Sequence, residues 1–208
     1  MKQEKPETQV VRKAYDRIAG SYDLFEWPVE KLFFNRWRRE LFAGLEGNIL
    51  EIGVGTGKNM PYYPANANVT AIDLSRGMLS KAHKRKEASG YAVDLREMDA
   101  EDLRFPAKSF DHVVATFVLC SVPDPVQALK EMKRVVRHRG TIILLEHVLS
   151  DRVFLSAIQR FHNPFTRHLF GFNIDRDTKS NIGKAGLSIM ADVHLGFYDV
   201  FRRFTSHP

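Results

Sequence analysis

The sequence predicts an α/β protein built on a doubly wound, mostly parallel sheet. Three observations lead to this fold class. From Asn48 onward, apolar runs of strand length alternate with helix-period segments, a glycine-rich stretch follows the first run, and two closely spaced runs end the chain. Strands that alternate with helices give a parallel sheet with helices on both faces, and the closing pair predicts an antiparallel hairpin at the sheet edge.

We expect the first 45 residues to form an N-terminal helical cap. Residues 1–9 are polar and are expected to be frayed, as chain ends commonly are. From Val10 to Leu45 the pattern is helical and rich in aromatic residues and arginines. Pro28 is expected to start a second helix within this cap, because proline fits the first helical turn.

Strands and helices then follow in order. Asp124 is expected to cap one helix, DPVQALKEMKRVVRHRG, with Pro125 in its first turn. Asp175 and Asp177 are expected to cap a short helix that ends at Gly186. A third helix is expected in SRGMLSKAHKRKEASG, with Ser75 as its cap and Gly90 at its end. The strand candidates are NILEIG, NVTAIDL, YAVDLREM, FDHVVATFV and GTIILLEHV, and the hairpin lies in AGLSIMADVHLGFYDVFRRFT.

The length of 208 residues predicts one domain, since roughly 150 residues per domain is the usual scale. Within it we expect the cap at residues 1–45, a core that holds the ligand at 46–147, and lid helices with the hairpin at 148–208. Hydrophobic residues make up 44% and charged residues 27%, which is typical of a globular chain and argues against wholesale disorder.

The sequence does not predict a membrane span or a signal peptide. No stretch reaches the ~20 consecutive apolar residues that cross a bilayer, and the opening MKQEKPETQ lacks the apolar core of a signal peptide. The single cysteine, Cys120, cannot form an internal disulfide, in agreement with a reducing compartment. We therefore expect a cytoplasmic protein, and peripheral contact with the inner face of the membrane stays open.

The charge of the chain favours anionic partners. A formal net charge of +6 suits phospholipid surfaces, nucleic acid or acidic metabolites. The sequence has no zinc-finger, basic-zipper or RNA-binding signature, so nucleic acid is not the expected partner.

The glycine-rich stretch NILEIGVGTGKN does not match either common nucleotide motif. A P-loop needs glycine where Ile52 stands and serine or threonine where Asn59 stands. The dinucleotide fingerprint G-x-G-x-x-G fails because Lys58 occupies the third glycine position. A different ligand is therefore expected at this turn.

The remaining pattern, Glu51-x-Gly53-x-Gly55-x-Gly57, resembles the class I S-adenosylmethionine-dependent methyltransferases, together with the rest of residues 48–147. The resemblance implies a Rossmann-like sheet of seven mostly parallel strands, S-adenosylmethionine as cofactor, and residues 46–147 as the cofactor-binding core. It also implies that the glycines let the backbone approach the methionine and ribose parts, and that Glu51 lies near the amino group.

Asp73 lies twenty residues after Gly53 and ends the second strand candidate. A carboxylate at this place can accept hydrogen bonds from both ribose hydroxyls. The resemblance extends to the residues around adenine and along the fourth strand, where Asp111 stands near the strand start and residues Thr116 to Cys120 at the far end line the methyl-transfer cavity. The further residues expected at the cofactor are Leu74, Met78, Asp99, Ala100, Thr116 and Phe117. Singly, each also has a plain reading as a cap, turn or core residue.

Methyl transfer needs orientation more than a protein nucleophile, and an acceptor that carries a proton needs a general base. We expect the base among four residues, namely His147, Tyr22, Tyr15 and Tyr198. A histidine bonded to a loop carbonyl is the alternative for His147. His162 and His168 lack a carboxylate partner at ligand spacing, so no metal site is expected.

Two segments outside the core are expected to select the acceptor. RVFLSAIQRFHNPFTRHLFGF contains three arginines, two histidines, five phenylalanines and no acid, and KLFFNRWRREL is similarly basic and aromatic. This composition suits a membrane interface, where apolar faces enter the headgroup boundary and basic residues meet lipid phosphate. A lid helix with phenylalanines toward the core is the open alternative.

The opening YDRIAGSYD resembles the ubiquinone/menaquinone C-methyltransferases and the small bacterial phospholipid N-methyltransferases, and FVLCSVPDP and LLEHV resemble membrane-associated thiol methyltransferase-like proteins. The leading hypothesis is methyl transfer to the amine of phosphatidylethanolamine. A small-molecule thiol or a quinone ring carbon is the alternative acceptor, and a cofactor-binding regulatory protein is the alternative without catalysis.

Overall fold

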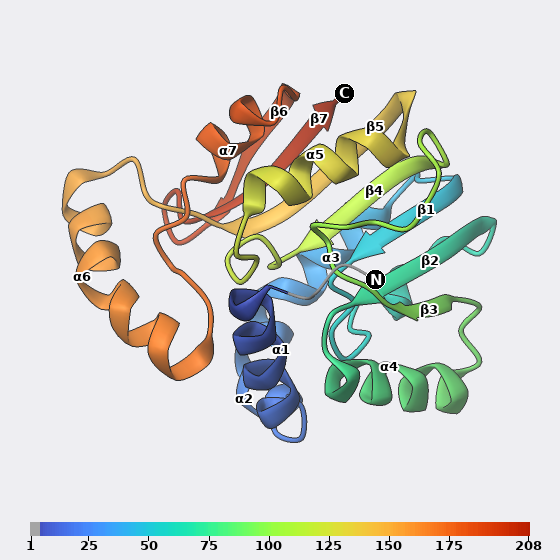
Figure 1. Cartoon of the computed structure of the whole chain (residues 1–208), viewed down its shortest axis with the longest axis horizontal. Coiled ribbons are helices and arrows are strands. Elements are labelled where there is room, and N and C mark those ends of the chain that lie inside the picture. Colours follow the sequence, from blue (N-terminus) through green and yellow to red (C-terminus); the bar gives the residue numbers. More distant parts are fainter. Residues whose placement is uncertain (1–4) are drawn as a thin grey trace.

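The computed structural model describes residues 5–208, apart from the side chains of residues 25 and 167–170, and contains one seven-stranded sheet flanked by helices (Figure 1). The strands are β1 Gly47–Ile52, β2 Ala67–Asp73, β3 Asp94–Glu97, β4 Phe110–Thr116, β5 Val136–His147, β6 Ser188–Gly196 and β7 Phe201–His207. The α-helices are α1 Pro6–Ile18, α2 Tyr22–Val29, α3 Asn35–Phe42, α4 Arg76–Ser89, α5 Pro125–Val135, α6 Val153–Phe170 and α7 Thr178–Lys184. A π-helical turn, Glu30–Phe34, joins α2 to α3.

The strand order across the sheet is β3-β2-β1-β4-β5-β7-β6. The first five strands pair in parallel, whereas β7 is antiparallel to both β5 and β6. The predicted doubly wound α/β class with an antiparallel hairpin at the edge is confirmed. The division into a cap, a core and a lid region stays a prediction.

Three helices begin at predicted caps. The hydroxyl of Ser75 accepts the N–H of Met78 at the start of α4. The carboxylate of Asp124 accepts the N–H of Gln127 at the start of α5. At α7 the cap is Asp177. Each cap satisfies a backbone donor that the first helical turn leaves without a partner.

Three predictions for local structure are wrong. Residues 6–9 are not frayed, because α1 begins at Pro6 and buries Thr8 completely. Pro28 lies inside α2 rather than starting a helix. Because proline has no backbone N–H, it cannot donate the usual helical hydrogen bond, and the π-helical turn comes directly after this interruption. Residues 136–140 extend β5 instead of α5 and bring Gly140 so near β4 that a Cβ there would lie 2.5 Å from the Asp111 carbonyl.

Apolar side chains pack on both faces of the sheet. Along β4, Val113 and Ala115 belong to the cluster that includes residues of α5 and α7, and Val114 belongs to the cluster that includes residues of α3 and α4. Alternate residues of a strand point to opposite faces, so this central strand is buried on both sides. The rigid centre of the sheet therefore lies next to the strand ends where ligands are expected.

Helix α6 stands apart from the sheet (Figure 1). Its side chains at Phe154, Ile158, Phe161 and Phe165 recur at helical spacing and are exposed by 77%, 42%, 82% and 73%. The apolar face of this helix thus points away from the protein, so the alternative in which its phenylalanines face the core is wrong for these positions. Among the described residues, none of the helices combines the length and the apolar character that crossing a bilayer needs.

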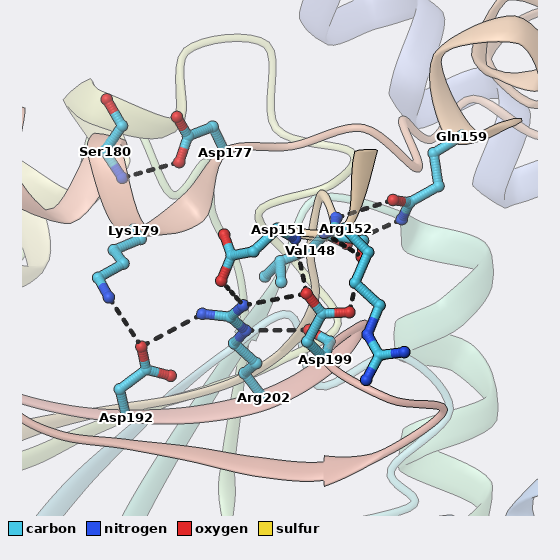
Figure 2. Close-up of polar contacts among 11 residues, drawn as sticks. Val148, Asp151, Arg152, Gln159, Asp177, Lys179, Ser180, Asp192, Asp199 and Arg202 are labelled. Carbon is cyan, nitrogen blue, oxygen red and sulfur yellow. Dashed lines mark hydrogen bonds and ion pairs between the residues drawn. The ribbon is translucent and has the colours of Figure 1, made fainter. Parts of the chain in front are cut away.

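Polar contacts hold the start of α6. Figure 2 shows Asp151, Asp192 and Asp199 around the buried guanidinium of Arg202. Arg202 pairs with Asp151 and, at 3.3 Å, with Asp192, and the Asp199 carboxylate accepts the N–H of Asp151 at 2.6 Å. Within the helix, the Gln159 amide donates to two backbone carbonyls, at 2.8 and 2.9 Å. We call these five residues the α6 anchor.

Candidate functional site

A first cavity lies at the carboxyl ends of β1, β2 and β4, the place where doubly wound sheets bind ligands. Nine of the residues predicted at the cofactor line it: Gly53, Gly55, Asp73, Leu74, Met78, Asp99, Ala100, Thr116 and Phe117. Its volume of about 100 Å³ is below the roughly 300–1,000 Å³ of pockets that enclose small-molecule ligands.

The glycine loop needs glycine for steric reasons. Gly53 and Gly55 have φ values of +70° and +56°, in the left-handed region that other residues rarely adopt. A Cβ on Gly53 would lie 2.4 Å from a methyl carbon of Val118, whereas a Cβ on Gly55 would meet nothing within 4 Å. The loop therefore packs closely on one side and leaves bare backbone at the cavity.

Asp73 ends β2 and lines the first cavity. Its two carboxylate oxygens accept the N–H groups of Gly55 and Ser75, each at 2.8 Å. Burial raises the pKa of Asp73 to about 6, against the lowering effect of these hydrogen bonds. The side chain is thus mainly ionised at pH 7 and can accept hydrogen bonds from a diol such as that of ribose.

The structure does not bring Glu51 and Gly57 to the cavity. Glu51 is buried, its carboxylate accepts the Asn59 amide at 2.6 Å and the Tyr63 hydroxyl, and burial raises its pKa. Gly57 has a φ of +85°, and a Cβ there would lie 2.7 Å from the end of the Met60 side chain. Both residues shape the loop from behind, and the contact of Glu51 with the cofactor amino group stays a prediction.

A second cavity, of about 340 Å³, adjoins the first. Tyr15, Tyr22 and Phe117 line both cavities and form their common wall. The remaining lining of the second cavity consists of Ile18, Glu26, Phe34, Cys120, His147, Phe172 and Phe201. The arrangement puts a mostly aromatic space directly beside the glycine loop and Asp73.

Helix α1 covers the first cavity with Val11, Arg12 and Tyr15. Polar contacts fix it there. Asp16 accepts the Ser75 hydroxyl at 2.6 Å and the Gly77 N–H at 2.8 Å, and Arg12 pairs with Glu97. The small volume of the first cavity follows from this cover.

His147 lies in the second cavity beside the rings of Phe172 and Phe201, at centroid distances of 5.9 and 6.5 Å. Burial lowers its pKa to about 4, so the imidazole is neutral at pH 7 and able to accept a proton. Burial also raises the pKa values of Tyr15 and Tyr22, which therefore remain protonated phenols and can orient a ligand by hydrogen bonds.

Two reactive side chains are less suited to chemistry. Burial raises the pKa of the Cys120 thiol far above its usual range, so Cys120 behaves as a small apolar residue. Tyr198 lines neither cavity. This residue is 67% exposed and lies in the β6–β7 turn, where its φ is +62°. The centroid of its ring is 4.3 Å from the guanidinium carbon of Arg152. The structure thus does not bring Tyr198 together with the other three predicted bases, because the hairpin turn directs its side chain outward.

The wall between the cavities rests on a buried carboxylate. Oε1 of Glu146, in β5, accepts the N–H groups of Val118 and Leu119 at 2.9 and 3.0 Å. These bonds hold the chain just after Phe117, which has a left-handed φ of +57°. Burial raises the pKa of Glu146 to about 7, since the two backbone donors offset desolvation only in part.

Several site residues were not predicted from the sequence. They are Glu26, Phe34, Phe172 and Phe201 in the second cavity and Arg12 in the first. One signal was available, because Tyr22 and Glu26 are four residues apart and thus share a helix face. The other residues lie far apart in the sequence and meet only through the fold. Among residues 5–208, no group of three His, Cys, Asp or Glu residues is placed to hold a metal ion.

Comparison with known proteins identifies a family. The family model described as "Methyltransferase domain" matches residues 50–144. The chain is 40% identical to a phosphatidylethanolamine N-methyltransferase of Cereibacter sphaeroides, over 78% of this chain and 85% of that enzyme. It is 36% identical to a thiol S-methyltransferase of Homo sapiens, over 73% and 67%, and 29% identical to a ubiquinone/menaquinone biosynthesis C-methyltransferase of Desulfotalea psychrophila, over 93% and 85%.

The fold has close structural neighbours. A solved geranyl diphosphate methyltransferase, in complex with geranyl diphosphate and sinefungin, superposes with a TM-score of 0.74. The match covers 97% of this chain and 99% of that one at 11% identity. At this identity the similarity concerns the fold alone.

Proposed function

The chain belongs to the S-adenosylmethionine-dependent methyltransferases, and from that premise we propose that it methylates a membrane-presented acceptor, the amine of phosphatidylethanolamine. The protein is an enzyme and its cofactor is S-adenosylmethionine, which sets aside the alternative of a regulatory protein without catalysis. The identity of the acceptor is the proposed part.

The first cavity has the groups that this cofactor requires. The bare backbone of Gly53 and Gly55 would lie against its methionine and ribose parts, Asp73 would accept from the ribose hydroxyls, and Met78 would pack on adenine. When bound, the cofactor supplies a methyl group on a positively charged sulfur, ready for in-line displacement. The protein's task is to hold the acceptor in line, which is worth roughly 7–11 kcal/mol of barrier.

The outward apolar face of α6 is the observation that carries the acceptor class. Phe154, Phe161 and Phe165 are exposed on a helix in which Arg160 is also exposed and which contains no acidic residue. Such a helix suits the boundary between lipid headgroups and acyl chains, and the exposed Arg160 suits anionic lipid. The similarity to a phosphatidylethanolamine N-methyltransferase supports the amine as the accepting atom.

A small thiol and a quinone ring are the competing acceptors. The rings around the second cavity would pack equally well against an aromatic acceptor, and the similarity to a thiol S-methyltransferase supports a sulfur nucleophile. A soluble thiol, however, would leave the outward face of α6 without a use.

Transfer of labelled methyl groups tests the proposal. Wild-type protein with labelled S-adenosylmethionine is offered phosphatidylethanolamine vesicles, a small soluble thiol and a quinol in parallel. We expect label in the lipid fraction. Transfer to the thiol or the quinol with none to lipid would contradict the proposed acceptor while leaving the methyltransferase assignment intact.

His147 is the proposed general base, because it lies in the second cavity as a neutral imidazole. Tyr15 and Tyr22, at the common wall, are proposed to orient the acceptor as neutral phenols. We expect His147→Asn to lower kcat by about 10²–10⁴-fold, the usual range for a general base, and to change the pH dependence of kcat. An unchanged pH profile in the variant would remove His147 from this role.

A further inference from the structure

The second cavity carries one charged side chain that the family similarity does not explain. Among its described lining residues Glu26 is the acid, in a wall otherwise made of rings, aliphatic groups, Cys120 and the neutral His147. Its side chain is 27% exposed. A carboxylate in such surroundings loses solvation, so a positively charged partner stabilises it.

The structure already shows an ammonium group against Glu26 and Tyr22, two residues of this wall. The Lys58 Nζ lies 2.6 Å from Glu26 Oε2 and 5.2 Å from the centroid of the Tyr22 ring. Tyr22 and Glu26 lie one helical turn apart on α2, and the nearby charge of Glu26 contributes, after burial, to raising the pKa of Tyr22. The lysine therefore displays the two interactions that bind ammonium groups in proteins, a carboxylate and an aromatic face.

The positive charge of Lys58 is shared among three carboxylates, so it does not neutralise Glu26 completely. Its Nζ also lies 3.7 Å from Asp23 and 3.6 Å from Glu30. Those two acids have their own partners: Asp23 pairs with Arg85 at 2.7 Å, and Glu30 pairs with Arg38 at 2.7 Å. A carboxylate has about four acceptor positions, so Glu26 has capacity for a second cation on the cavity side.

Three rings that line the same cavity as Glu26 complete a site for such a cation. Phe34 and Phe117 contact each other at a centroid distance of 4.6 Å, and Phe201 lies 5.6 and 5.9 Å from them. Aromatic faces attract an ammonium whether or not it has N–H groups, whereas a carboxylate adds hydrogen bonds to the protonated forms. A neutral thiol or quinone gains nothing from Glu26.

Resting on the proposed function, we propose that the second cavity is an ammonium-binding site in which Glu26 is the counter-charge and the rings of Tyr22, Phe34 and Phe117 form the walls. Glu26 thereby selects amines, which bind as ammonium ions, against neutral acceptors of the same size. A primary or partly methylated ammonium passes a proton to the proposed base His147, and the freed lone pair then takes the methyl group from sulfur, leaving S-adenosylhomocysteine. The quaternary product carries no proton and is bound by the same charge.

Binding can be measured without methyl transfer. Protein loaded with S-adenosylhomocysteine is titrated by calorimetry with choline and, separately, with its uncharged isostere 3,3-dimethyl-1-butanol. We expect wild-type protein to bind choline at least tenfold more tightly than the isostere, and Glu26→Gln to lose this preference. Glu46→Gln, which removes an exposed acid outside both cavities, is the matched control and should keep it.

A second variant separates recognition from folding. Lys58→Met removes the competing ammonium, so choline should bind more tightly than to wild type, whereas damage to the fold would weaken binding of both compounds. Tyr22→Phe keeps the ring and should retain most of the preference. Equal binding of choline and its isostere by wild type, or an undiminished preference in Glu26→Gln, would overturn the proposal.

The result is independent of the acceptor assay. Glu26-dependent choline binding without methylation of phosphatidylethanolamine would mean that the acceptor is a different amine. Methylation of that lipid with choline binding that ignores Glu26 would place the ammonium group elsewhere and leave the proposed function standing.

Discussion

The sheet buries apolar side chains, whereas helix α6 exposes apolar side chains and is held by polar contacts. In the sheet, apolar residues such as Val113 and Phe204 are fully buried, whereas α6 exposes Phe154, Phe161 and Phe165 and is held by the polar contacts of the α6 anchor. The sheet is thus stabilised by its own packing and can hold Asp73 and the glycine loop rigidly. The outward apolar face of α6 is suited to contact with a surface outside this chain.

The largest expected effect comes from replacing a phenylalanine by alanine once in the sheet and once in α6. Phe204→Ala, in β7, should lower the free energy of unfolding by about 3–5 kcal/mol, as for other buried phenylalanines. Phe161→Ala, on α6, should change it by less than about 0.5 kcal/mol because the ring is 82% exposed. Urea denaturation measures both. Equal losses would show that α6 packs against the body of the protein in solution.

The next effect concerns cofactor binding by the sheet region. Asp73→Ala removes an ionised acceptor that also holds the N–H groups of Gly55 and Ser75. Hydrogen bonds to charged groups are worth about 1.5–3 kcal/mol each, so calorimetry should show S-adenosylmethionine binding weakened about a hundredfold or more. Asp94→Ala, at an exposed acid on neighbouring β3, is the control and should bind normally. Normal binding by Asp73→Ala would count heavily against the cofactor site.

A pH effect sharpens the contrast between buried and surface acids. Because the pKa of Glu146 is raised from 4.5 to about 7, the folded state holds this proton more tightly than the unfolded state. The resulting stability is fully present below pH 4.5 and is lost between pH 4.5 and 7. Glu146→Gln should make stability fall less over this range, by at most about 3 kcal/mol.

The matched comparison for this pH effect is Glu46→Gln, at an exposed acid. Comparing each variant with wild type cancels the other groups that titrate in the same range, such as Asp73 and His147. If the stability of Glu146→Gln follows the wild-type pH curve, the carboxyl of Glu146 has an ordinary pKa in the folded protein.

The smallest effect tests the outer surface. Arg160→Gln removes one exposed positive charge from α6 and should weaken binding to anionic vesicles by about 1 kcal/mol, roughly fivefold, at low salt. Arg139→Gln, which removes an equivalent exposed charge from the far end of β5, is the control. Vesicle sedimentation measures the difference, and the two variants should converge at high salt. Equal weakening by both would mean that binding follows net charge rather than α6.

Local rules predicted the features of the sheet region. The capping residues Ser75 and Asp124 and the acid Asp73 act through neighbours a few residues away or through strand ends that a parallel sheet brings together. These relations depend on spacing, which a sequence displays directly.

The second cavity depends on contacts that spacing does not show. Phe172 follows α6 and Phe201 begins β7, yet both meet His147. Tyr198 lies outside both cavities because the turn before β7 has a left-handed backbone, which the sequence Gly-Phe-Tyr does not indicate. The predicted helix start at Pro28 was wrong because the π-helical turn after this proline accommodates a residue that normally ends or begins a helix.

The cover that α1 places over the first cavity has a consequence for the order of events in turnover. A space of about 100 Å³ is smaller than a ligand of this size needs, so we expect α1 to move when the cofactor enters or leaves, and Tyr15 and Ile18 of that helix are also walls of the second cavity. Each exchange of cofactor therefore opens the acceptor site too. For an amine that accepts several methyl groups, we expect distributive methylation, with mono- and dimethylated products released and rebound between successive transfers.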